Sequence, residues 1–432
     1  MNYVVASIMT RLPEILSSKL AIIIYIAVIL ASIFALMIVL IVRENSKKSV
    51  EYPYGVGGMP QNTEKTEESD AGEAKRFCML SEIEAKKESY GHSDYDNEIT
   101  LEGLCNDFRD YAASRLKLYY DIEDIRRFIA GMAVSHILIL QGMSGTGKTS
   151  LAHAFGSYID NASTIIPVQP MWKERTDLIG YYNEFTRKFN ETLLLEKMYE
   201  ANYSEDMYIT VLDEMNIARI EYYFAEFLSL LELPNPEERY IDVVSDRWEN
   251  DPEQLKDGRI KLPPNMWFIG TANNDDSTFA ISDKVYDRAM ILNLDAKSER
   301  YVAPKKEKIH ISSECFNRLV REAMEEYDVS RRNMKRLEAL DQYLIEHFHI
   351  TFGNRIMKQI KTYIPVYVSC GGDELDALDD ILSKKVIRKL ETQNPIYLRN
   401  AAEGLIEYIN ELFGNDKMTL CKEYIYRLER NA

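Results

Sequence analysis

The sequence predicts an α/β fold in which a largely parallel sheet, with helices on both faces, is followed by an all-helical region. Three observations lead to this prediction. A glycine-rich phosphate-binding motif at residues 141–150 lies between an apolar run and a helical stretch. Short apolar runs then alternate with helical stretches, which favours parallel strands joined by helices. From about Ile311 to Tyr426 the strand signals fade and long amphipathic patterns take over.

The first element along the chain is an apolar run, Leu20–Val42, that carries no charged residue. As a helix it is long enough to cross a bilayer with some tilt. Arg43 follows it at once, whereas a cleavable signal peptide usually has a shorter apolar core and a small-residue cleavage site. We therefore expect residues 1–48 to contain one transmembrane helix, at 20–42. Because an enzyme that uses nucleotides needs the cytosolic pool, the rest of this single-pass membrane protein is expected in the cytoplasm.

Residues 49–98 are polar and acidic, with few side chains that could build a core. This composition predicts a flexible acidic linker, with a short helix around Phe77–Lys87. Apolar residues then recur at helical spacing between residues 101 and 134 and lead into the first strand. We expect residues 99–300 to form the α/β nucleotide-binding domain, and residues 301–432 to form a helical lid with further C-terminal helices.

The net charge of the chain is −17. This argues against a broad nucleic-acid-binding surface, which depends on clustered Lys and Arg, so direct binding of nucleic acid is not expected. The five cysteines are scattered and none forms a C-x-x-C pair. The sequence therefore suggests neither a disulfide framework nor a zinc site, and a reducing compartment fits best.

The phosphate-binding motif has the order G-x-x-x-x-G-K-[ST], formed by Gly142, Gly147, Lys148 and Thr149. Glycines let backbone N–H groups turn inward at phosphate oxygens, the lysine adds positive charge near the β- and γ-phosphates, and the threonine hydroxyl is a ligand for Mg²⁺. The motif is informative only between a buried strand and a helix, and the flanking residues supply both. The residues expected to bind nucleotide here are Gly142, Ser144, Gly145, Thr146, Gly147, Lys148, Thr149 and Ser150.

Further strands are expected at Thr164–Val168, Tyr208–Asp213, Met266–Thr271 and Ala289–Leu294. The second of these is followed directly by Glu214, so that it ends in two acids. Opposite a phosphate loop, Asp213 would hold Mg²⁺ through its water shell and Glu214 would polarise the attacking water. Many strands end in acidic residues for solubility alone, and the phosphate loop upstream is what favours the catalytic interpretation. An antiparallel hairpin with an acidic surface loop is expected between residues 240–244 and 259–262.

Four segments of the chain, in order, resemble the motifs of an AAA+ ATPase: GMSGTGKTSLAHAF, VQPMWKERTDLIGYYN, LDEMNIARIEYYFAEFLSLLE and LPPNMWFIGTANNDDSTFAISDKVYDRA. The resemblance covers about residues 137–390. Within the AAA+ ATPases, the chain resembles more specifically the McrB-like and MoxR-like clade, which has dynein-related AAA domains. It implies a P-loop NTPase with a five-stranded parallel sheet and an all-helical lid. It also implies ATP as the default nucleotide, Mg²⁺ as cofactor, and assembly into a homo-oligomeric, hexameric ring.

The resemblance assigns roles to three further residues. Asn273, at the end of the strand MWFIGTAN, matches the polar residue that positions the lytic water. Arg288 matches the arginine finger that reaches the γ-phosphate of a neighbouring subunit. Arg355 stands where a lid helix commonly brings a second arginine to the phosphates. The other arginines near it are Arg331, Arg332 and Arg336.

Trp172 and the stretch Asp177–Tyr182 match an insert that projects toward the central pore of the ring in this clade. Local packing is the alternative for these aromatic side chains. The run Glu221–Leu231, after the two acids, is expected as an amphipathic helix of the core.

These features predict a membrane-anchored AAA+ ATPase that binds and hydrolyses ATP in an oligomeric ring, to remodel or activate an unidentified partner protein. Two alternatives stay open. One is a GTP-using, McrB-type motor subunit for a nuclease partner, and the other is a nucleotide-gated membrane scaffold with little turnover. Intact Lys148, Asp213, Glu214, Asn273 and Arg288 favour turnover over the scaffold.

Overall fold

The computed structural model describes residues 75–91, 94–273, 278–295 and 298–431. All of these belong to one unit, Ala71–Ala432. Over these ranges no helix is both long enough and apolar enough to span a bilayer. The transmembrane helix expected at residues 20–42 lies outside the described residues, so the membrane anchor stays a prediction.

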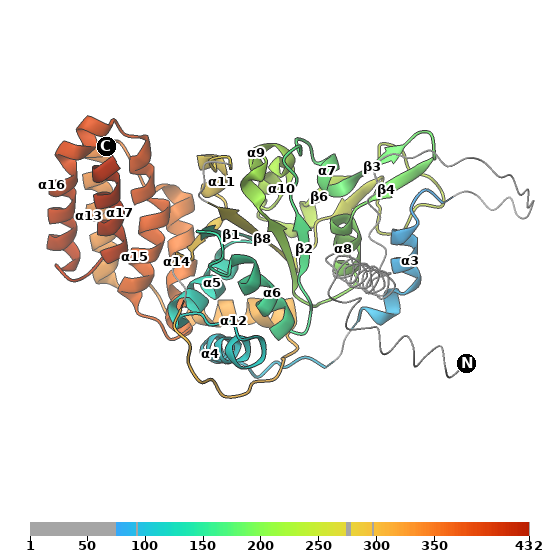
Figure 1. Ribbon diagram of the computed structural model, residues 1–432, viewed down its shortest axis with the longest axis horizontal. Coiled ribbons are helices and arrows are strands. Elements are labelled where there is room, and N and C mark those ends of the chain that lie inside the picture. Colours follow the sequence, from blue (N-terminus) through green and yellow to red (C-terminus); the bar gives the residue numbers. More distant parts are fainter. Residues whose placement is uncertain (1–74, 92–93, 274–277, 296–297, 432) are drawn as a thin grey trace, which may run out of the picture. The chain divides into compact units, whose positions relative to one another are not determined.

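A five-stranded sheet lies at the centre of this unit (Figure 1). All neighbouring strands are parallel, so their carboxyl ends meet at one edge of the sheet. The register places Gly142 beside Asn273 and Pro167 beside Asp213 at that edge. The predicted five-stranded parallel sheet is therefore confirmed. In spatial order the strands are β2 (Thr164–Pro167), β5 (Tyr208–Asp213), β8 (Met266–Asn273), β1 (Ile137–Gly142) and β9 (Met290–Asn293).

Both faces of the sheet are buried, because successive side chains of a strand point to opposite faces and both sets are apolar here. On β1, Leu138 and Leu140 belong to one hydrophobic cluster, whereas Ile137 and Ile139 belong to the other. The first cluster packs against α4 (Leu101–Tyr111), α5 (Ile122–Val134) and α6 (Lys148–Tyr158). The second packs against α8 (Leu193–Ala201), α9 (Ile220–Tyr223) and α10 (Ala225–Leu230). The last two helices occupy the run expected as one helix and are separated by Phe224.

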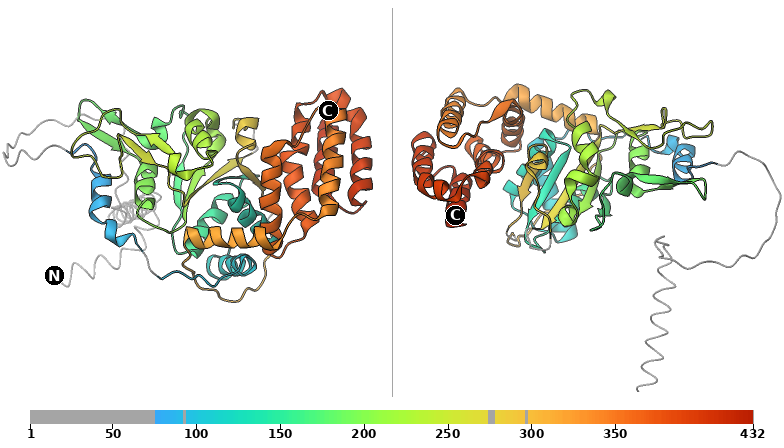
Figure 2. Two further views of the ribbon diagram at one scale, coloured as in Figure 1. Left: turned by 180° about the vertical axis from the view of Figure 1, so that it is seen from behind. Right: turned by 90° about the horizontal axis from the view of Figure 1, so that it is seen from above.

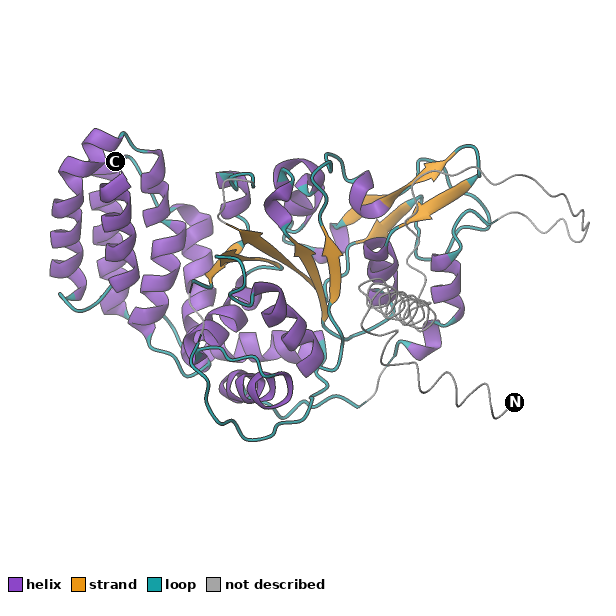
Figure 3. Ribbon diagram, in the orientation of Figure 1, coloured by secondary structure: helices purple, strands orange, loops and turns teal. Residues whose placement is uncertain are grey.

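Two antiparallel hairpins extend from the sheet domain, on the side away from the C-terminal helices (Figure 3). The hairpin of β6 (Tyr240–Asp242) and β7 (Arg259–Lys261) was expected from the sequence. The other joins β3 (Gly180–Asn183) to β4 (Lys188–Glu191) and follows the short helix α7 (Thr176–Ile179). The side chain of Phe185, in the turn of this second hairpin, is fully exposed.

Residues 75–91, which the sequence assigns to the flexible linker, fold against the β3–β4 hairpin. Phe77 and Leu80 are buried, and the rings of Phe77 and Phe189 lie 4.9 Å apart. Burial of side chains of this size stabilises a fold by about 1.5–3 kcal/mol each. At the start of α3 (Met79–Ala85), the carboxylate of Glu191 accepts hydrogen bonds from the backbone N–H groups of Cys78, Met79 and Leu80. The expected short helix is present, but as part of the folded unit.

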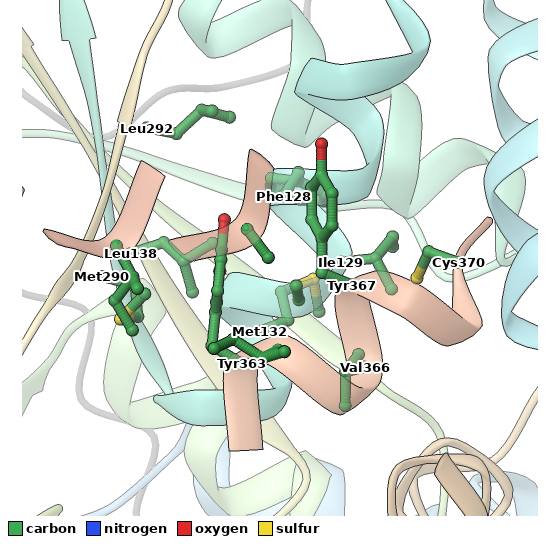
Figure 4. Close-up of a cluster of buried hydrophobic side chains, with 14 of the residues drawn as sticks. Phe128, Ile129, Met132, Leu138, Met290, Leu292, Tyr363, Val366, Tyr367 and Cys370 are labelled. Carbon is green, nitrogen blue, oxygen red and sulfur yellow. The ribbon is translucent and has the colours of Figure 1, made fainter. Parts of the chain in front are cut away.

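The C-terminal region is helical, as predicted. Its members are α12 (Ser313–Glu326), α13 (Arg331–Phe348), α14 (Gly353–Ser369), α15 (Glu374–Lys385), α16 (Pro395–Phe413) and α17 (Thr419–Asn431). Figure 2 shows α13 to α17 grouped at the end of the unit opposite the β3–β4 hairpin. Helix α14 joins this group to the sheet, because its Tyr363, Val366 and Tyr367 lie among buried side chains of α5, β1 and β9 (Figure 4).

Candidate nucleotide site

The phosphate loop connects the carboxyl end of β1 to the start of α6, as expected. Gly142, Gly145 and Gly147 all have positive φ angles, a conformation that favours glycine. At Gly142 a Cβ atom would collide with the backbone carbonyl of Leu294, so the close approach of these two segments also requires glycine. The backbone oxygen of Gly147 accepts a hydrogen bond from the Tyr120 hydroxyl, at 3.2 Å. Tyr120 thus supports the loop from the side of α5.

Lys148 is the first residue of α6 and is buried. Its Nζ donates hydrogen bonds to the backbone oxygens of Gly142, at 3.0 Å, and Met143, at 2.8 Å. The ammonium group therefore lies on the concave side of the loop. A positive charge held there by backbone oxygens faces the place where a P-loop carries the β- and γ-phosphates.

Thr149 and Asp213, the residues predicted to serve Mg²⁺, are in direct contact. Oδ1 of Asp213 accepts hydrogen bonds from the hydroxyls of Thr149, at 2.7 Å, and Thr271, at 2.8 Å. A hydroxyl beside a carboxylate is the oxygen donor set that Mg²⁺ prefers, so these residues fit that ion. Sequence reasoning missed Thr271. It stands two residues before Asn273, and the alternation of the strand would have placed both on one face.

Glu214 follows the end of β5 with a positive φ of 54°. For a residue other than glycine this backbone conformation is uncommon and is typical of functional sites. Its N–H group donates to the Thr271 hydroxyl, at 2.9 Å, and the residue is exposed. Since Glu214 makes no side-chain hydrogen bond or ion pair with another described residue, its carboxylate is available to polarise water.

Asn273 ends β8 directly beside Gly142, at the same edge of the sheet as the phosphate loop. The buried side chain of Asn216 holds this strand end, because its Nδ2 donates to the backbone oxygen of Asn273, at 2.9 Å, and to that of Phe279, at 3.2 Å. Asn216 also escaped sequence reasoning. Its position three residues after Asp213 places it in the turn between the acids and α9 (residues 220–223).

Arg288 and Arg355 lie at the opposite, amino edge of the sheet. Arg288 precedes β9, and its backbone oxygen accepts a hydrogen bond from Ser135 Oγ, at 2.9 Å, just before β1. The six residues of β1 then separate this position from the phosphate loop. At about 3.3 Å per residue, the separation is roughly 20 Å. The structure therefore brings neither arginine to the phosphate loop of its own chain.

The two arginines meet each other instead, at Glu232. Arg288 Nε lies 2.7 Å from Glu232 Oε2, and an Arg355 terminal nitrogen lies 2.7 Å from Oε1. For Arg355 this differs from the expected place beside the other nucleotide-binding residues, and the reason is that α14 docks along α5 and β9. The three other arginines stand on α13, where the Arg336 guanidinium lies over the Phe413 ring.

A cavity of about 830 Å³ opens at the carboxyl end of β9, and residues 142–149 of the phosphate loop are not part of its lining. Asn293 and Asp295 line it where β9 ends, next to Leu294 and Gly142. Asp121 and Asp124, at the start of α5, form a second wall, and α15 and α17 form the rest. On α17 the guanidinium of Arg427 lies 4.3 Å from the centre of the Tyr424 ring. Burial raises the pKa of Asp124 to about 6, although the nearby Arg127 opposes the shift.

The aromatic residues of the expected insert divide into two groups. Trp172 is half-buried and packs edge-on against Tyr223, with ring centres 5.5 Å apart, so it serves local packing. Tyr181 and Phe185 are exposed on the β3–β4 hairpin. Exposed aromatic side chains are thus found both within the indicated stretch, at Tyr181, and in the hairpin turn beyond it, at Phe185.

Comparison with known proteins gives two family matches, one of which covers the phosphate loop and the acids. Residues 137–289 match the family model of the AAA domain, dynein-related subfamily. Residues 306–432 match a domain of unknown function (DUF8727). No curated protein matches the chain.

Two solved structures can be compared with the chain as a whole. One, described as a "putative ATPase" from Cytophaga hutchinsonii ATCC 33406, has a TM-score of 0.46 and 14% identity, and the match covers 76% of this chain and 97% of that one. The other, a full-length MCM homolog from Methanopyrus kandleri, has a TM-score of 0.37 and 11% identity, over 74% of this chain and 63% of that one. Both scores are low, and neither structure informs the site. The family match and the ordered site residues show that residues 137–289 form an AAA domain of the dynein-related type.

Proposed function

We propose that this protein is a membrane-anchored ATPase that hydrolyses ATP in a ring of identical subunits and uses the turnover to remodel or activate a partner protein. One observation carries the proposal: the residues of a hydrolytic site are divided between opposite edges of one sheet. The phosphate loop and the acids lie at the carboxyl edge, and the two arginines lie at the amino edge. Two neighbouring copies together would supply a complete site.

Each residue at the carboxyl edge has a defined task in this proposal. The backbone of the loop and Lys148 bind the phosphates, and Thr149 and Asp213 would hold Mg²⁺. The ion, when bound, neutralises charge on the phosphate oxygens. Glu214 polarises the attacking water, and Asn273 orients it from the neighbouring strand.

The sheet order gives the nucleotide a direction. Strands β5 and β8, which carry Asp213 and Asn273, lie on one side of β1, and β9 lies on the other. With its terminal phosphate toward the acids, a nucleotide would extend toward β9, where the cavity of about 830 Å³ opens. A cavity of this size fits a nucleoside. The lining, which holds acidic, basic and aromatic side chains, leaves both ATP and GTP open, and ATP is the default implied by the family resemblance.

The ring follows from the two edges. A contact in which the amino edge of one copy meets the carboxyl edge of the next joins two different surfaces, and such head-to-tail contacts close into rings when the rotation allows. An arginine that reaches a neighbour's γ-phosphate stabilises charge that develops during transfer, so turnover would depend on assembly. The number of six subunits rests on the family resemblance alone.

The partner and the membrane anchor rest on two separate features of the chain. The exposed Phe185 and Tyr181 on the β3–β4 hairpin support contact with another protein, since exposed aromatic side chains are frequent at such interfaces. The anchor rests on the apolar sequence of residues 20–42. A scaffold with little turnover is disfavoured by the available carboxylate of Glu214.

The test is steady-state hydrolysis of ATP and GTP by the full chain in detergent. Glu214→Gln should keep binding a fluorescent ATP analogue while turnover falls about 10²- to 10⁴-fold, because only the group that polarises water is lost. Glu221→Gln, a change of the same chemistry seven residues further along the chain, is the matched control and should behave as wild type. Unchanged turnover of Glu214→Gln would contradict its role, and a wild-type protein inactive with both nucleotides would contradict the proposed function.

A further inference from the structure

We propose that Glu232 is a positioning residue, which holds Arg288 and Arg355 as one unit for the nucleotide of the adjacent subunit. The inference rests on the proposed function, since it concerns how the amino edge of the sheet serves hydrolysis next door. Neither the sequence motifs nor the family matches assign a role to Glu232.

The geometry is that of one carboxylate shared by two guanidinium groups. Oε2 of Glu232 lies 2.7 Å from Arg288, and Oε1 lies 2.7 Å from Arg355. The three residues come from three separate elements: the turn after α10, the segment after the short helix α11 (Asp283–Tyr286), and the first turn of α14. Each oxygen thus serves a different arginine. The Arg288 contact is an ion pair without hydrogen-bond geometry, so it is the charge of the carboxylate that holds the two side chains near one another.

The backbones that carry these side chains are held independently of the carboxylate. The backbone oxygen of Leu233, next to Glu232, accepts two hydrogen bonds from the buried guanidinium of Arg239. Gln359, one turn after Arg355 on α14, donates to the backbone oxygen of Asp287 at 3.3 Å. Removal of the Glu232 charge should therefore release the arginine side chains while the surrounding fold remains.

The charges explain why a shared acid is needed. Two guanidinium groups that converge on one point repel each other, and the carboxylate between them removes most of that repulsion. The trio keeps a net charge of about +1, because two cations share one anion. It lines a pocket of about 570 Å³ that also contains Lys358, and both arginine side chains remain partly exposed there. The pocket can therefore still attract an anionic group such as a terminal phosphate.

The experiment compares variants of the full chain in detergent. Glu232→Gln should lower kcat at least tenfold while KM and the affinity for a fluorescent ATP analogue change less than twofold, because the subunit's own nucleotide site is intact. Glu232→Asp, which keeps the charge on a shorter side chain, should recover part of the loss. Glu226→Gln is the matched control, since Glu226 stands on α10, the helix just before Glu232, and pairs with Arg175, at 2.9 Å, away from the trio. It should keep wild-type kcat.

Mixed subunits separate positioning from a general loss of structure. A Glu214→Gln subunit is inactive but has an intact arginine trio, and a Glu232→Gln subunit has an intact phosphate loop and acid. Mixing the two should restore turnover well above that of either alone. The inference is overturned if Glu232→Gln keeps wild-type kcat, if Glu226→Gln loses as much, or if mixing restores nothing. Failure of the wild-type protein to hydrolyse any nucleotide would be a separate result, which contradicts the proposed function and with it this role.

Discussion

The two edges of the central sheet are built in different ways. At the carboxyl edge, Lys148, Thr149 and Asp213 come from short motifs in which neighbouring residues determine the geometry. Thr149 contacts Asp213 directly, and Lys148 is held by backbone oxygens of the phosphate loop itself. At the amino edge, Arg288, Arg355 and Glu232 are single charged residues from distant parts of the chain, and only the tertiary fold brings them together. Binding of phosphate is therefore a local property of this chain, whereas the arginine group depends on how the helical region docks.

The largest effect should come from the amino edge. Arg288→Ala should lower turnover about 10³-fold or more, because a positive charge at the developing transition state is lost. Mixing with Lys148→Ala subunits, which bind no nucleotide but carry Arg288, should restore part of the activity in an ATPase assay. Arg331→Ala, an exposed arginine on α13, is the control and should leave turnover unchanged. Oligomers that form without any rescue would contradict action across the interface.

A change at the carboxyl edge should behave in the opposite way. Thr271→Val removes a hydroxyl that orients Asp213 and should weaken the affinity for Mg²⁺ by about 10- to 100-fold, the usual effect of losing a group that orients a metal ligand. Titration of ATPase activity with Mg²⁺ measures this. High Mg²⁺ should recover turnover, whereas mixing with Lys148→Ala subunits should not. Rescue by mixing would show that the two edges are not independent.

A smaller effect is expected at the far end of the nucleotide. Arg427→Ala on α17 should weaken ATP binding about 2- to 5-fold, the size of a partly exposed cation–π contact, and leave binding of inorganic tripolyphosphate unchanged. Calorimetric titration with both ligands makes the comparison. Arg399→Ala, an exposed arginine on α16, serves as the control. An equal loss for both ligands would place Arg427 at the phosphates and not at the nucleoside.

The last effect concerns stability and not turnover, and it arises at Asp124, which lines that cavity. Burial raises the pKa of Asp124 from 3.8 to about 6. Between these two pH values, the carboxyl group is protonated in the folded state and ionised in the unfolded state. The free energy of unfolding should therefore fall as pH rises from about 4 through 6, by up to about 3 kcal/mol. Arg127 on the same helix and Lys384 on α15 both favour the charged carboxyl and limit the loss.

Asp124→Asn should remove this dependence, since an amide does not titrate. Thermal unfolding of wild type and variant at pH 4.5 and pH 7 checks the expectation. The difference in stability between the variant and wild type should favour the variant more at pH 7 than at pH 4.5. A difference in unfolding midpoint that does not change with pH would contradict the raised pKa.

The contrast between the edges also explains what the sequence could and could not predict. The strands, the phosphate loop and Asp213 follow from local apolar runs and motif spacing, and the structure has them where expected. Glu232 carries no such signal, because a single glutamate after a helix is usually a solvated charge. The place of Arg355 depends on the packing of α14 against α5, a contact between residues far apart in the chain.

Composition misled in one place for a related reason. Phe77, Leu80 and Ile83 are among the few apolar residues of an acidic stretch, and an average over that stretch hides them. Their spacing of three residues marks one face of a helix, and that face is buried. The acceptor that completes the helix start is Glu191, more than a hundred residues later, which no local pattern could reveal.

The attachment of residues 75–91 has a mechanical consequence. Arg76 is buried between Asp251 of the acidic loop and the Trp248 ring, and α3 is capped by Glu191 of β4. A pull on the chain from its N-terminal side therefore acts first on the β3–β4 hairpin and the acidic loop, and reaches the sheet only through them. A movement of the β3–β4 hairpin would in turn pull on residues 75–91.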